Sequence, residues 1–192
     1  YRIPYLVYAH GKEIMGLSVK ARQRLRTVAA DARRMIAVSE ATAARLEENG
    51  IPRERIAVIR NGTTTIPEDE LGAPRGGEPV ILAVGRLVRR KGFHLLIASM
   101  PTLAERGWRL RVVGAGPEEA ALREQVTRAG LETAVTLTGA ISEDQLWAEY
   151  RRASIFALPA VDDADGFEGL GIVLLEAAAF GLPLVGFAGG AV

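Results

Sequence analysis

Short apolar runs alternate with stretches of helical periodicity over the first 60 residues. Short apolar runs bounded by turn residues predict buried strands, and apolar positions recurring every three or four residues predict amphipathic helices. The expected order is strand 4–9, helix 18–34, strand 35–38, helix 40–49 and strand 56–59. Leu25, Val28 and Ala32 are expected to share one side of the first helix, and Ser39 is a typical N-cap for the second.

A more regular alternation begins at residue 80. Expected strands at 80–84, 110–113, 134–137, 155–158 and 184–187 alternate with helices near 91–106, 117–129, 142–153 and 171–180. These strands are nearly continuous apolar runs, which is typical of parallel strands buried on both faces. Strand–helix alternation of this kind predicts an α/β fold, with a parallel sheet covered by helices on both sides.

A polar segment separates the two alternating regions. Residues 67–79 hold three prolines and three glycines and lack apolar periodicity. We therefore expect a partial N-terminal domain over residues 1–67, a linker over 68–79 and a second domain over 80–192. The chain starts without a methionine and stops just after a strand, so we expect truncation at both ends.

Composition narrows the class of protein. Hydrophobic residues make up 48% of the chain and charged residues 24%, which is ordinary for a globular protein. There is no cysteine, so disulfides, thiolate metal sites and a cysteine nucleophile are excluded, and a reducing compartment fits. No run approaches the roughly 18 apolar residues of a membrane span. We expect a cytoplasmic protein.

Positive charge is concentrated at the front of the chain. Residues 1–60 hold twelve Lys and Arg against six Asp and Glu, although the whole chain has a net charge of only +1. This basic front portion could bind an anionic membrane surface, an acidic acceptor or nucleic acid. A solvated helix face explains the same charge and is the favoured interpretation.

Cationic residues follow the first strand of the second region. Gly85-Arg86-Leu87 leads into Arg89-Arg90-Lys91-Gly92. Ligands of open parallel sheets bind at the carboxyl ends of strands, and Arg or Lys beside a helix N-terminus suits phosphate oxygens. We favour a phosphate role for Arg86 and Lys91, and we interpret Arg89 and Arg90 as solvated.

The next strand ends in Gly114-Ala-Gly116, a weak match to a dinucleotide-binding turn. The third glycine of that fingerprint is replaced by Glu119, and no acidic residue ends the following strand at the usual offset. A tight turn with Pro117 at the first helical position explains the glycines equally well.

The segment 165–176 combines glycines with two glutamates. Glycines at 166, 169 and 171 let backbone amides approach a ligand closely. Glu176 lies among apolar residues of the last expected helix, so a buried carboxylate there needs a partner. The hydroxyls of a ribose would suit Glu176, and those of a sugar would suit Glu168. A buried ion pair for Glu176 and an exposed Glu168 explain the composition equally well.

Position along the chain does not by itself assign a catalytic or metal-binding role to either histidine. His10 ends the first strand and is more often structural than catalytic in such a place, and His94 lies in an amphipathic helix as a surface or packing residue. No cluster at metal-ligand spacing is present, so we expect no metal site. The acidic run 162–165 is interpreted as a solvated loop.

Together these segments resemble one known family. Residues 168–176 resemble the Glu-x7-Glu motif of family 4 glycosyltransferases, which are retaining enzymes of the GT-B fold. Residues 6–11, 36–39, 58–62, and 80–87 with Lys91 resemble other segments of that family. The resemblance implies a Rossmann-like donor domain and the C-terminal part of a Rossmann-like acceptor domain. The glycine-rich donor loop is similar to that of bacterial mannosyltransferases with lipid acceptors.

The resemblance also implies roles for the candidates. Arg86 and Lys91 would hold the donor diphosphate, Glu176 the ribose hydroxyls, Glu168 the sugar ring, and His10 would lie beside the reaction centre. The backbone at Gly169, Leu170, Gly171 and Ile172 would meet the sugar and phosphate, and Ile141 the base. The reaction would be front-face transfer with retention, relying on electrostatic stabilisation of the leaving group and on no cofactor or metal.

Several alternatives stay open. A sugar-nucleotide epimerase on the same fold, or a non-catalytic sugar-nucleotide-binding module, would keep much of this pattern. A dehydrogenase is least expected because the dinucleotide fingerprint is incomplete. The donor could be GDP-mannose, a UDP-sugar or ADP-glucose, and the acceptor a lipid or a saccharide. Nucleic acid is not an expected partner. A peripheral contact of the basic front portion with the inner face of the membrane stays open as the alternative to a solvated helix face.

Overall fold

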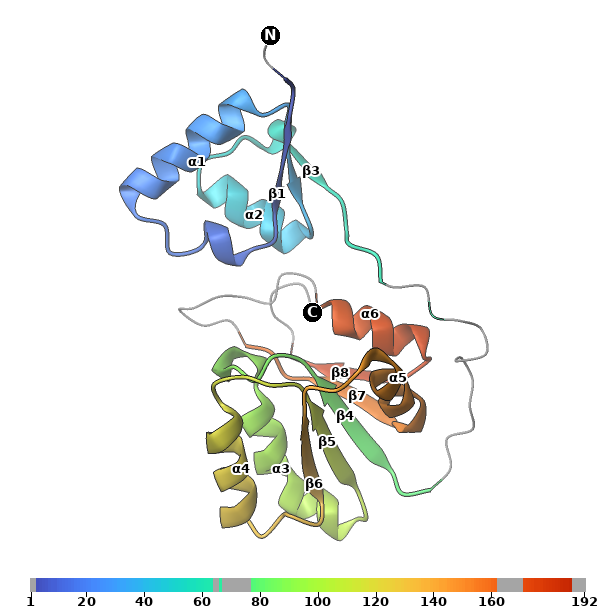
Figure 1. The fold of residues 1–192 in the computed structure, drawn as a ribbon. Helices are drawn as coiled ribbons and strands as arrows, with labels where there is room; N and C mark the ends of the chain where they lie inside the picture. Colours follow the sequence, from blue (N-terminus) through green and yellow to red (C-terminus); the bar gives the residue numbers. More distant parts are fainter. Residues whose placement is uncertain (1–2, 64–65, 67–76, 162–170, 188–192) are drawn as a thin grey trace. The chain divides into compact units, whose positions relative to one another are not determined.

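The computed structural model describes residues 3–63, 66, 77–161 and 171–187 (Figure 1). The chain divides into two compact units. Unit 1 comprises residues 1–62 with 161–171 and 188–192, and unit 2 comprises residues 63–160 and 172–187. Most of the expected linker lies outside the described residues, but Ile66 already packs against the core of unit 2.

Unit 1 contains a parallel sheet of three strands. The strand order is β1 (Leu6–Ala9), β2 (Arg34–Ala37) and β3 (Ile56–Val58). The helices are α1 (Val19–Asp31) and α2 (Glu40–Glu48), with short 3-10 helices η1 (Lys12–Ile14) and η2 (Arg53–Arg55). Ser39 caps α2 as expected, because its hydroxyl accepts the backbone N–H of Thr42 at 3.1 Å.

The buried side of α1 differs from the expected one. Leu25 packs on the core of unit 1 and Ala29 is buried in it, whereas Val28 is 41% exposed. Residues four apart lie on one side of a helix, so Ala29 follows Leu25 toward the sheet and Val28 points outward. Ala32 is buried, as expected, but it lies just past the helix end.

Unit 2 contains a five-stranded parallel sheet with the order β6-β5-β4-β7-β8. The strands are β4 (Val80–Val84), β5 (Arg109–Val113), β6 (Val135–Gly139), β7 (Ile155–Leu158) and β8 (Leu184–Gly186). The helices are α3 (Phe93–Glu105), α4 (Glu119–Arg128), α5 (Glu143–Arg152) and α6 (Ile172–Ala179), preceded by the short 3-10 helix η4 (Arg89–Lys91). The α/β class expected from the sequence is confirmed.

Helices cover both faces of this sheet (Figure 1), and a hydrophobic core lies on each face. Ile81 and Ala83 of β4 pack with residues of α3 and α4. Leu82 and Val84 of the same strand pack with residues of α5 and α6. Successive side chains of a strand point to opposite faces, so the four residues 81–84 of β4 serve the two cores alternately. This explains why the strand is apolar without interruption.

An ion pair fixes α5 on the sheet. Arg111 of β5 donates from Nε and Nη2 to the two carboxylate oxygens of Glu149, at 2.5 and 2.6 Å. The two side chains are only 19% and 10% exposed. Replacing one partner of such a pair by a neutral residue would leave an uncompensated buried charge, which is strongly destabilising.

Within the described ranges, no helix is long and apolar enough to cross a membrane.

Candidate functional site

The strand order of unit 2 reverses between β4 and β7. From β4 the chain adds β5 and β6 on one side and then returns to add β7 and β8 on the other. In open parallel sheets, ligands bind outside the carboxyl ends of the strands at such a switch point. Arg86 and Lys91 follow β4 directly, and the segment before α6 follows β7. Among the described candidates, Arg86 and Lys91 follow β4, and Ile172 and Glu176 belong to the helix that follows β7, whereas Ile141 follows β6.

The cations lie in the loop between β4 and α3. Arg86 is exposed, while Lys91 is half-buried. The aliphatic stem of Lys91 runs back over Gly85, because a Cβ added to that glycine would lie 3.6 Å from Lys91 Cε. Both residues therefore belong to the loop at the carboxyl end of β4.

Lys91 does not open α3, contrary to the expected helix start near residue 91. It ends η4, and Gly92 separates it from α3, which begins at Phe93. Gly92 has φ +71°, a left-handed conformation that cannot continue a right-handed helix. The cations therefore lie in a tight turn before the helix and not in its first turn.

Glycines in these loops let backbone segments touch each other. A Cβ on Gly114 would lie 2.0 Å from the carbonyl oxygen of Gly85, and one on Gly116 would lie 2.3 Å from that of Leu87. The Leu87 N–H donates to the carbonyl of Ala115 at 3.0 Å. These glycines therefore pack the β5 loop against the β4 loop, which explains them without a dinucleotide.

Gly92 makes the corresponding contact on the other side of β4. A Cβ there would lie 2.0 Å from the carbonyl oxygen of Pro159, directly after β7. The two loops that flank the switch point are thus held together by backbone contact. Their relative position, and with it the position of Lys91, is fixed by the fold of unit 2.

Glu176 lies in the middle of α6 and faces α5. Its Oε2 accepts a hydrogen bond of 2.7 Å from the hydroxyl of Tyr150. The partner that its apolar surroundings required is therefore a phenol, and no ion pair of Glu176 is found among the residues that the structure describes. Burial, the hydrogen bond to Glu176 and the charge of that carboxylate together raise the pKa of Tyr150 far above its ordinary value.

Tyr150 is the residue at this site that sequence reasoning missed. It lies on α5, 26 positions before Glu176, and no local pattern joins the two. The available signal was indirect: Glu176 lies among apolar neighbours and needs a partner.

The remaining candidates lie in the loops before α6 and α5 or at the start of α6. Glu168, Gly169 and Leu170 lie outside the described residues. Gly171 has φ +64°, and Ile172 begins α6 and is 40% exposed. Ile141 lies in the loop between β6 and α5 and packs against the core between the sheet and α5 and α6. The ligand contacts expected for these residues remain predictions.

His10 lies in unit 1, at the carboxyl end of β1. Its side chain is exposed and its ring stacks on that of Tyr8, with centroids 6.3 Å apart. Glu13 closes the loop that follows, because its carboxylate accepts the backbone N–H groups of His10 and Gly11. His94 of α3 is partly buried. Its pKa is lowered by burial and by the nearby charge of Arg89, and raised less by Glu118.

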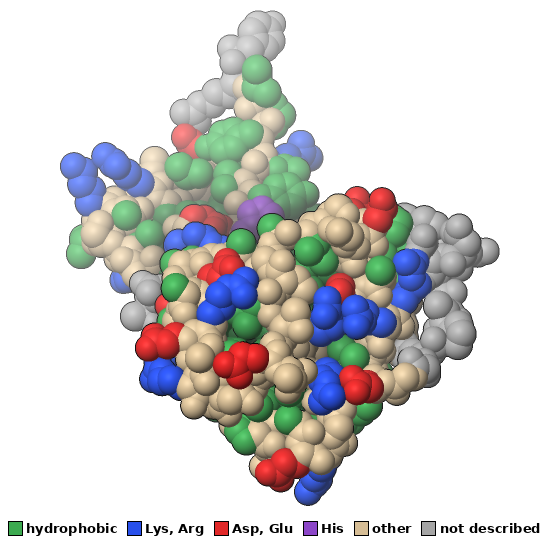
Figure 2. All heavy atoms as spheres, turned by 60° about the horizontal axis from the view of Figure 1, so that its bottom comes forward, with side chains coloured by type: hydrophobic (Ala, Val, Ile, Leu, Met, Phe, Trp, Pro, Cys, Tyr) green, Lys and Arg blue, Asp and Glu red, His purple; other side chains and the backbone are tan. Residues whose placement is uncertain are grey.

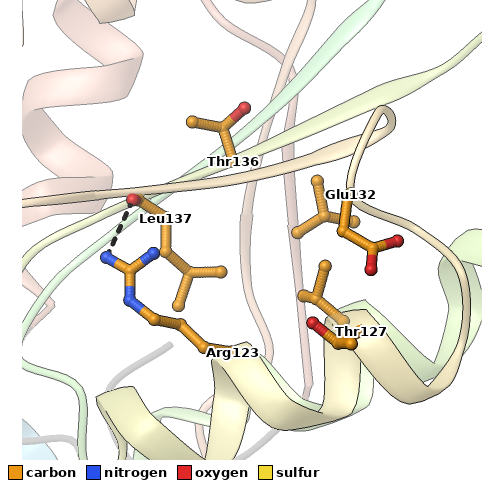
Figure 3. A pocket seen from close by; sticks show the side chains of 7 residues that line it. Arg123, Thr127, Glu132, Thr136 and Leu137 are labelled. Carbon is orange, nitrogen blue, oxygen red and sulfur yellow. Dashed lines mark hydrogen bonds between the residues drawn. The ribbon is translucent and has the colours of Figure 1, made fainter.

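A hollow of about 340 Å³ lies between α4 and the edge strand β6, away from the loops that follow β4 and β7 (Figure 3). Arg123 crosses it and donates to the carbonyl oxygen of Leu137 at 3.3 Å. At the other end of β6, the N–H of Val135 donates to the carbonyl of Leu131 at 2.8 Å. Both contacts occupy backbone groups of the edge strand, as in sheets protected against further pairing. The hollow therefore lies away from the switch point and carries no candidate.

Among the described residues, no group of three His, Cys, Asp or Glu side chains could hold a metal ion. The expectation of a reaction without metal or cofactor stays a prediction.

Comparison with curated proteins finds glycosyltransferases. The chain is 38% identical over 157 residues to a putative colanic acid biosynthesis glycosyltransferase, WcaL, of Escherichia coli, covering 79% of this chain and 38% of the relative. It is 34% identical over 197 residues to a GDP-mannose-dependent alpha-(1-6)-phosphatidylinositol monomannoside mannosyltransferase of Mycolicibacterium smegmatis, covering 95% and 52%. The chain thus spans about half or less of the length of these relatives.

Solved structures show the same fold. Anabaena Alr3699/HepE in complex with UDP and glucose matches with a TM-score of 0.77 and 23% identity, covering 98% of this chain and 54% of that one. A glycosyltransferase from Rickettsia africae matches with a TM-score of 0.77 and 18% identity, covering 97% and 52%. These neighbours are GT-B glycosyltransferases, so the fold expected from the resemblance is confirmed.

Family models account for nearly the whole chain. The model for "Glycosyltransferase Family 4" matches residues 1–65, and the model for "Glycosyl transferases group 1" matches residues 68–192, well over half of the sequence. The two matches meet between residues 65 and 68, a few residues after the division between residues 62 and 63 in the structure. The chain therefore belongs to the group 1 glycosyltransferases of family 4.

Proposed function

We propose that the whole protein is a retaining glycosyltransferase. It moves a hexosyl group from a nucleotide-diphosphate sugar, GDP-mannose or a UDP-sugar, to a lipid or saccharide acceptor. One observation carries this proposal: Arg86 and Lys91 follow β4 and the helix that carries Glu176 follows β7, on the two sides of the switch point of a parallel sheet. That arrangement suits a ligand with a diphosphate at one end and hydroxyl groups at the other.

Each residue has a role in the proposed reaction. Arg86 and Lys91 bind the diphosphate and stabilise the negative charge that develops on it as the glycosidic bond to the nucleotide breaks. Glu176 accepts hydrogen bonds from the ribose hydroxyls and Ile141 contacts the base. Glu168 and the backbone at Gly169–Ile172 bind the sugar. The departing phosphate accepts the acceptor's proton on the same face, so retention needs no protein nucleophile, and His10 assists beside the reaction centre.

The choice of donor rests on relatives and neighbours. The M. smegmatis relative is named as GDP-mannose-dependent and as acting on a phosphatidylinositol monomannoside, which supports GDP-mannose and a lipid acceptor. The Anabaena neighbour is in complex with UDP and glucose, which supports a UDP-sugar. The identity to the relative is higher than that to the neighbour, so we propose GDP-mannose first.

The test is a thermal-shift screen of the whole protein with GDP, UDP and ADP and their sugars, followed by product analysis with the stabilising donor. A ligand at one hundred times its Kd stabilises the folded state by about 2.7 kcal/mol, which is readily measured. Transfer to an acceptor supports the proposal. Epimerisation of the donor, or binding without turnover, supports the two alternatives.

Glu176→Ala is expected to weaken binding of the stabilising nucleotide about 10- to 100-fold, because two hydroxyls lose a charged acceptor. Calorimetric titration of the variant and of the wild type measures the change. Glu124→Ala, an exposed glutamate of α4 paired with Arg128 at 3.3 Å, is the matched control and should bind normally. Wild-type affinity in a folded Glu176→Ala variant would show that the ribose role is wrong.

We also propose that the basic front portion contacts the inner, anionic face of the membrane peripherally, which places the protein in the cytoplasm. Some of its Arg side chains form hydrogen bonds within unit 1 and so stabilise the fold. Arg55 donates to the carbonyls of Ala29, Ala30 and Ala32, and Arg26 donates to that of Asn49. Others stay on the surface: Lys20, Arg22 and Arg24 are exposed on the first two turns of α1. Figure 2 shows Lys and Arg side chains gathered at one end of unit 1, whereas both charges are interspersed over the visible face of unit 2.

Replacing Arg22 and Arg24 by Gln should weaken binding of the whole protein to phosphatidylglycerol-containing vesicles about thirtyfold, since each cation near an anionic surface contributes about 1 kcal/mol. Sedimentation with such vesicles, and with phosphatidylcholine vesicles for comparison, measures the effect. Arg106→Gln with Arg128→Gln removes the same charge from unit 2 and should change binding little. Equal losses in the two double variants would favour the solvated-face interpretation.

A further inference from the structure

We propose that Tyr150 is the positioning residue of the nucleotide site. Its hydroxyl holds Oε2 of Glu176, so that Oε1 is presented to the ribose hydroxyls of the donor. This inference rests on the proposed function and assigns a role to a residue that touches the ligand only through Glu176.

The contact is direct and well sheltered. The hydroxyl of Tyr150 lies 2.7 Å from Glu176 Oε2 and 3.5 Å from the carbonyl oxygen of Val173. A phenol has one proton to donate, and the shorter distance directs that proton to the carboxylate. Tyr150 itself is only 1% exposed. Water therefore does not compete for the hydroxyl, and the bond keeps the strength of a charge-assisted hydrogen bond.

Aromatic neighbours fix the ring that carries the hydroxyl. The ring of Phe180, at the end of α6, stacks on that of Tyr150 with centroids 5.2 Å apart and an interplanar angle of 13°. The ring of Phe156, from β7, lies 5.9 Å away at 33°. The residue before Tyr150 is Glu149, whose pair with Arg111 fixes α5 on the sheet. The position of the hydroxyl is thus determined by the sheet, α5 and α6 together.

Protonation keeps the phenol in the role of donor. Burial first, and then the hydrogen bond and charge of Glu176, raise the pKa of Tyr150 far above its ordinary value. Tyr150 therefore carries its proton across the whole pH range in which proteins of this kind are assayed. The phenol is therefore the donor of the hydrogen bond to Glu176 Oε2.

The space around the pair decides which oxygen is left for the ligand. A cavity of about 40 Å³ lies beside Tyr150 and Glu176, and Ile66 and Trp147 also line it. Ligand pockets measure about 300 to 1,000 Å³, so a nucleoside does not fit on this side. The ribose must meet the other side of the carboxylate. A glutamate has several rotatable bonds whose freedom is lost on binding, and the bond to Tyr150 restricts them before the ligand arrives.

The test compares nucleotides with and without ribose hydroxyls on the whole protein. Tyr150→Phe keeps the stacked ring and removes only the hydroxyl. We expect the Kd of the stabilising nucleoside diphosphate to rise about tenfold, as for loss of a hydrogen bond to a charged group. The Kd of its 2′,3′-dideoxy counterpart should stay unchanged, because that ligand has no hydroxyls for Glu176. Circular dichroism and thermal melting establish that the variant is folded.

Two further variants separate positioning from a general structural role. In a Glu176→Ala background, Tyr150→Phe should have no additional effect on the Kd. Tyr5→Phe is the matched control: its hydroxyl donates to the carbonyl of Val28 at 3.3 Å in unit 1, and both nucleotides should bind it normally. Equal weakening of ribose and dideoxy ligands by Tyr150→Phe, or wild-type affinity for both, overturns the proposal. If the wild-type protein binds no nucleotide at all, the proposed function fails as well.

Discussion

Replacing Arg86 by Met is expected to lower kcat for sugar transfer by two to three orders of magnitude in the whole protein. Negative charge grows on the diphosphate as the bond to the sugar breaks, so a cation at that place stabilises the transition state more than the bound donor. Removing one such group from a preorganised site typically costs about 10²- to 10³-fold in kcat. The Kd of the donor should rise much less than kcat falls.

The position of Arg86 makes it suitable for this role. It follows β4 at the switch point, its side chain is exposed, and no ion pair of Arg86 is found among the described residues. Lys91 of the same loop is held over Gly85 and would bind the other side of the diphosphate. Because the two cations act on one group, loss of both should cost less than the product of the single effects.

Arg89→Met is the matched control for Arg86→Met. Arg89 is an exposed cation of the same loop, and it is interpreted as solvated. Steady-state kinetics with the stabilising donor should give a kcat within a few-fold of the wild type for Arg89→Met, and partial activity for Arg86→Lys. If Arg89→Met is as damaging as Arg86→Met, the effect is one of overall loop charge and the specific role of Arg86 is wrong.

Replacing Gly92 by Ala is expected to destabilise unit 2 by about 2 to 5 kcal/mol, the sum of a conformational cost and an overpacking cost. Two costs combine. The left-handed conformation at φ +71° is unfavourable by about 1 to 2 kcal/mol for a residue with a Cβ. The new methyl group would also lie 2.0 Å from the carbonyl oxygen of Pro159. That oxygen belongs to the backbone at the end of β7 and cannot move without the strand.

Gly130→Ala separates these two costs. Gly130 has a similar left-handed φ of +65°, but nothing lies within 4 Å of an added Cβ. This variant should lose only the conformational part, about 1 to 2 kcal/mol. Urea unfolding of the whole protein, followed by circular dichroism, measures both. Equal losses would mean that the contact between Gly92 and Pro159 contributes nothing.

The Gly92→Ala substitution should also change ligand binding at the candidate site. Gly92 directly follows Lys91, and its contact with Pro159 sets the spacing of the loops after β4 and β7. We expect the folded fraction of Gly92→Ala to bind the donor more weakly than Gly130→Ala does, because the loops after β4 and β7 no longer keep their native spacing.

Much of the fold was predictable from local pattern. Continuous apolar runs such as β4 and β7 predicted parallel strands with the bounds that the structure has. The start of α3 was wrong by two residues, because sequence spacing does not show that Gly92 takes a left-handed conformation. The predicted buried side of α1 was wrong at Val28. Several residues of that helix are apolar, and which of them are buried depends on how the helix packs on the sheet.

The candidate site was predictable only in part. Arg86 and Lys91 stand out because two cations follow an apolar strand and a glycine, and Glu176 stands out because its neighbours are apolar. Tyr150 does not stand out, because a tyrosine on an amphipathic helix is ordinary core composition. The pair of Gly114 and Gly116 was ambiguous, because glycines that admit a phosphate and glycines that admit a neighbouring carbonyl look the same in a sequence.

By itself the sequence determined the alternation of strands and helices, the α/β class, the family and the cations at a strand end. All of these depend on residue type and spacing, which a linear pattern contains. Only the tertiary structure decided that Glu176 is held by Tyr150 and that Gly92 and Gly114 join neighbouring loops. These contacts join residues that are 26 to 67 positions apart. Such pairs are brought together by the order of the strands in the sheet, and no local spacing encodes that order.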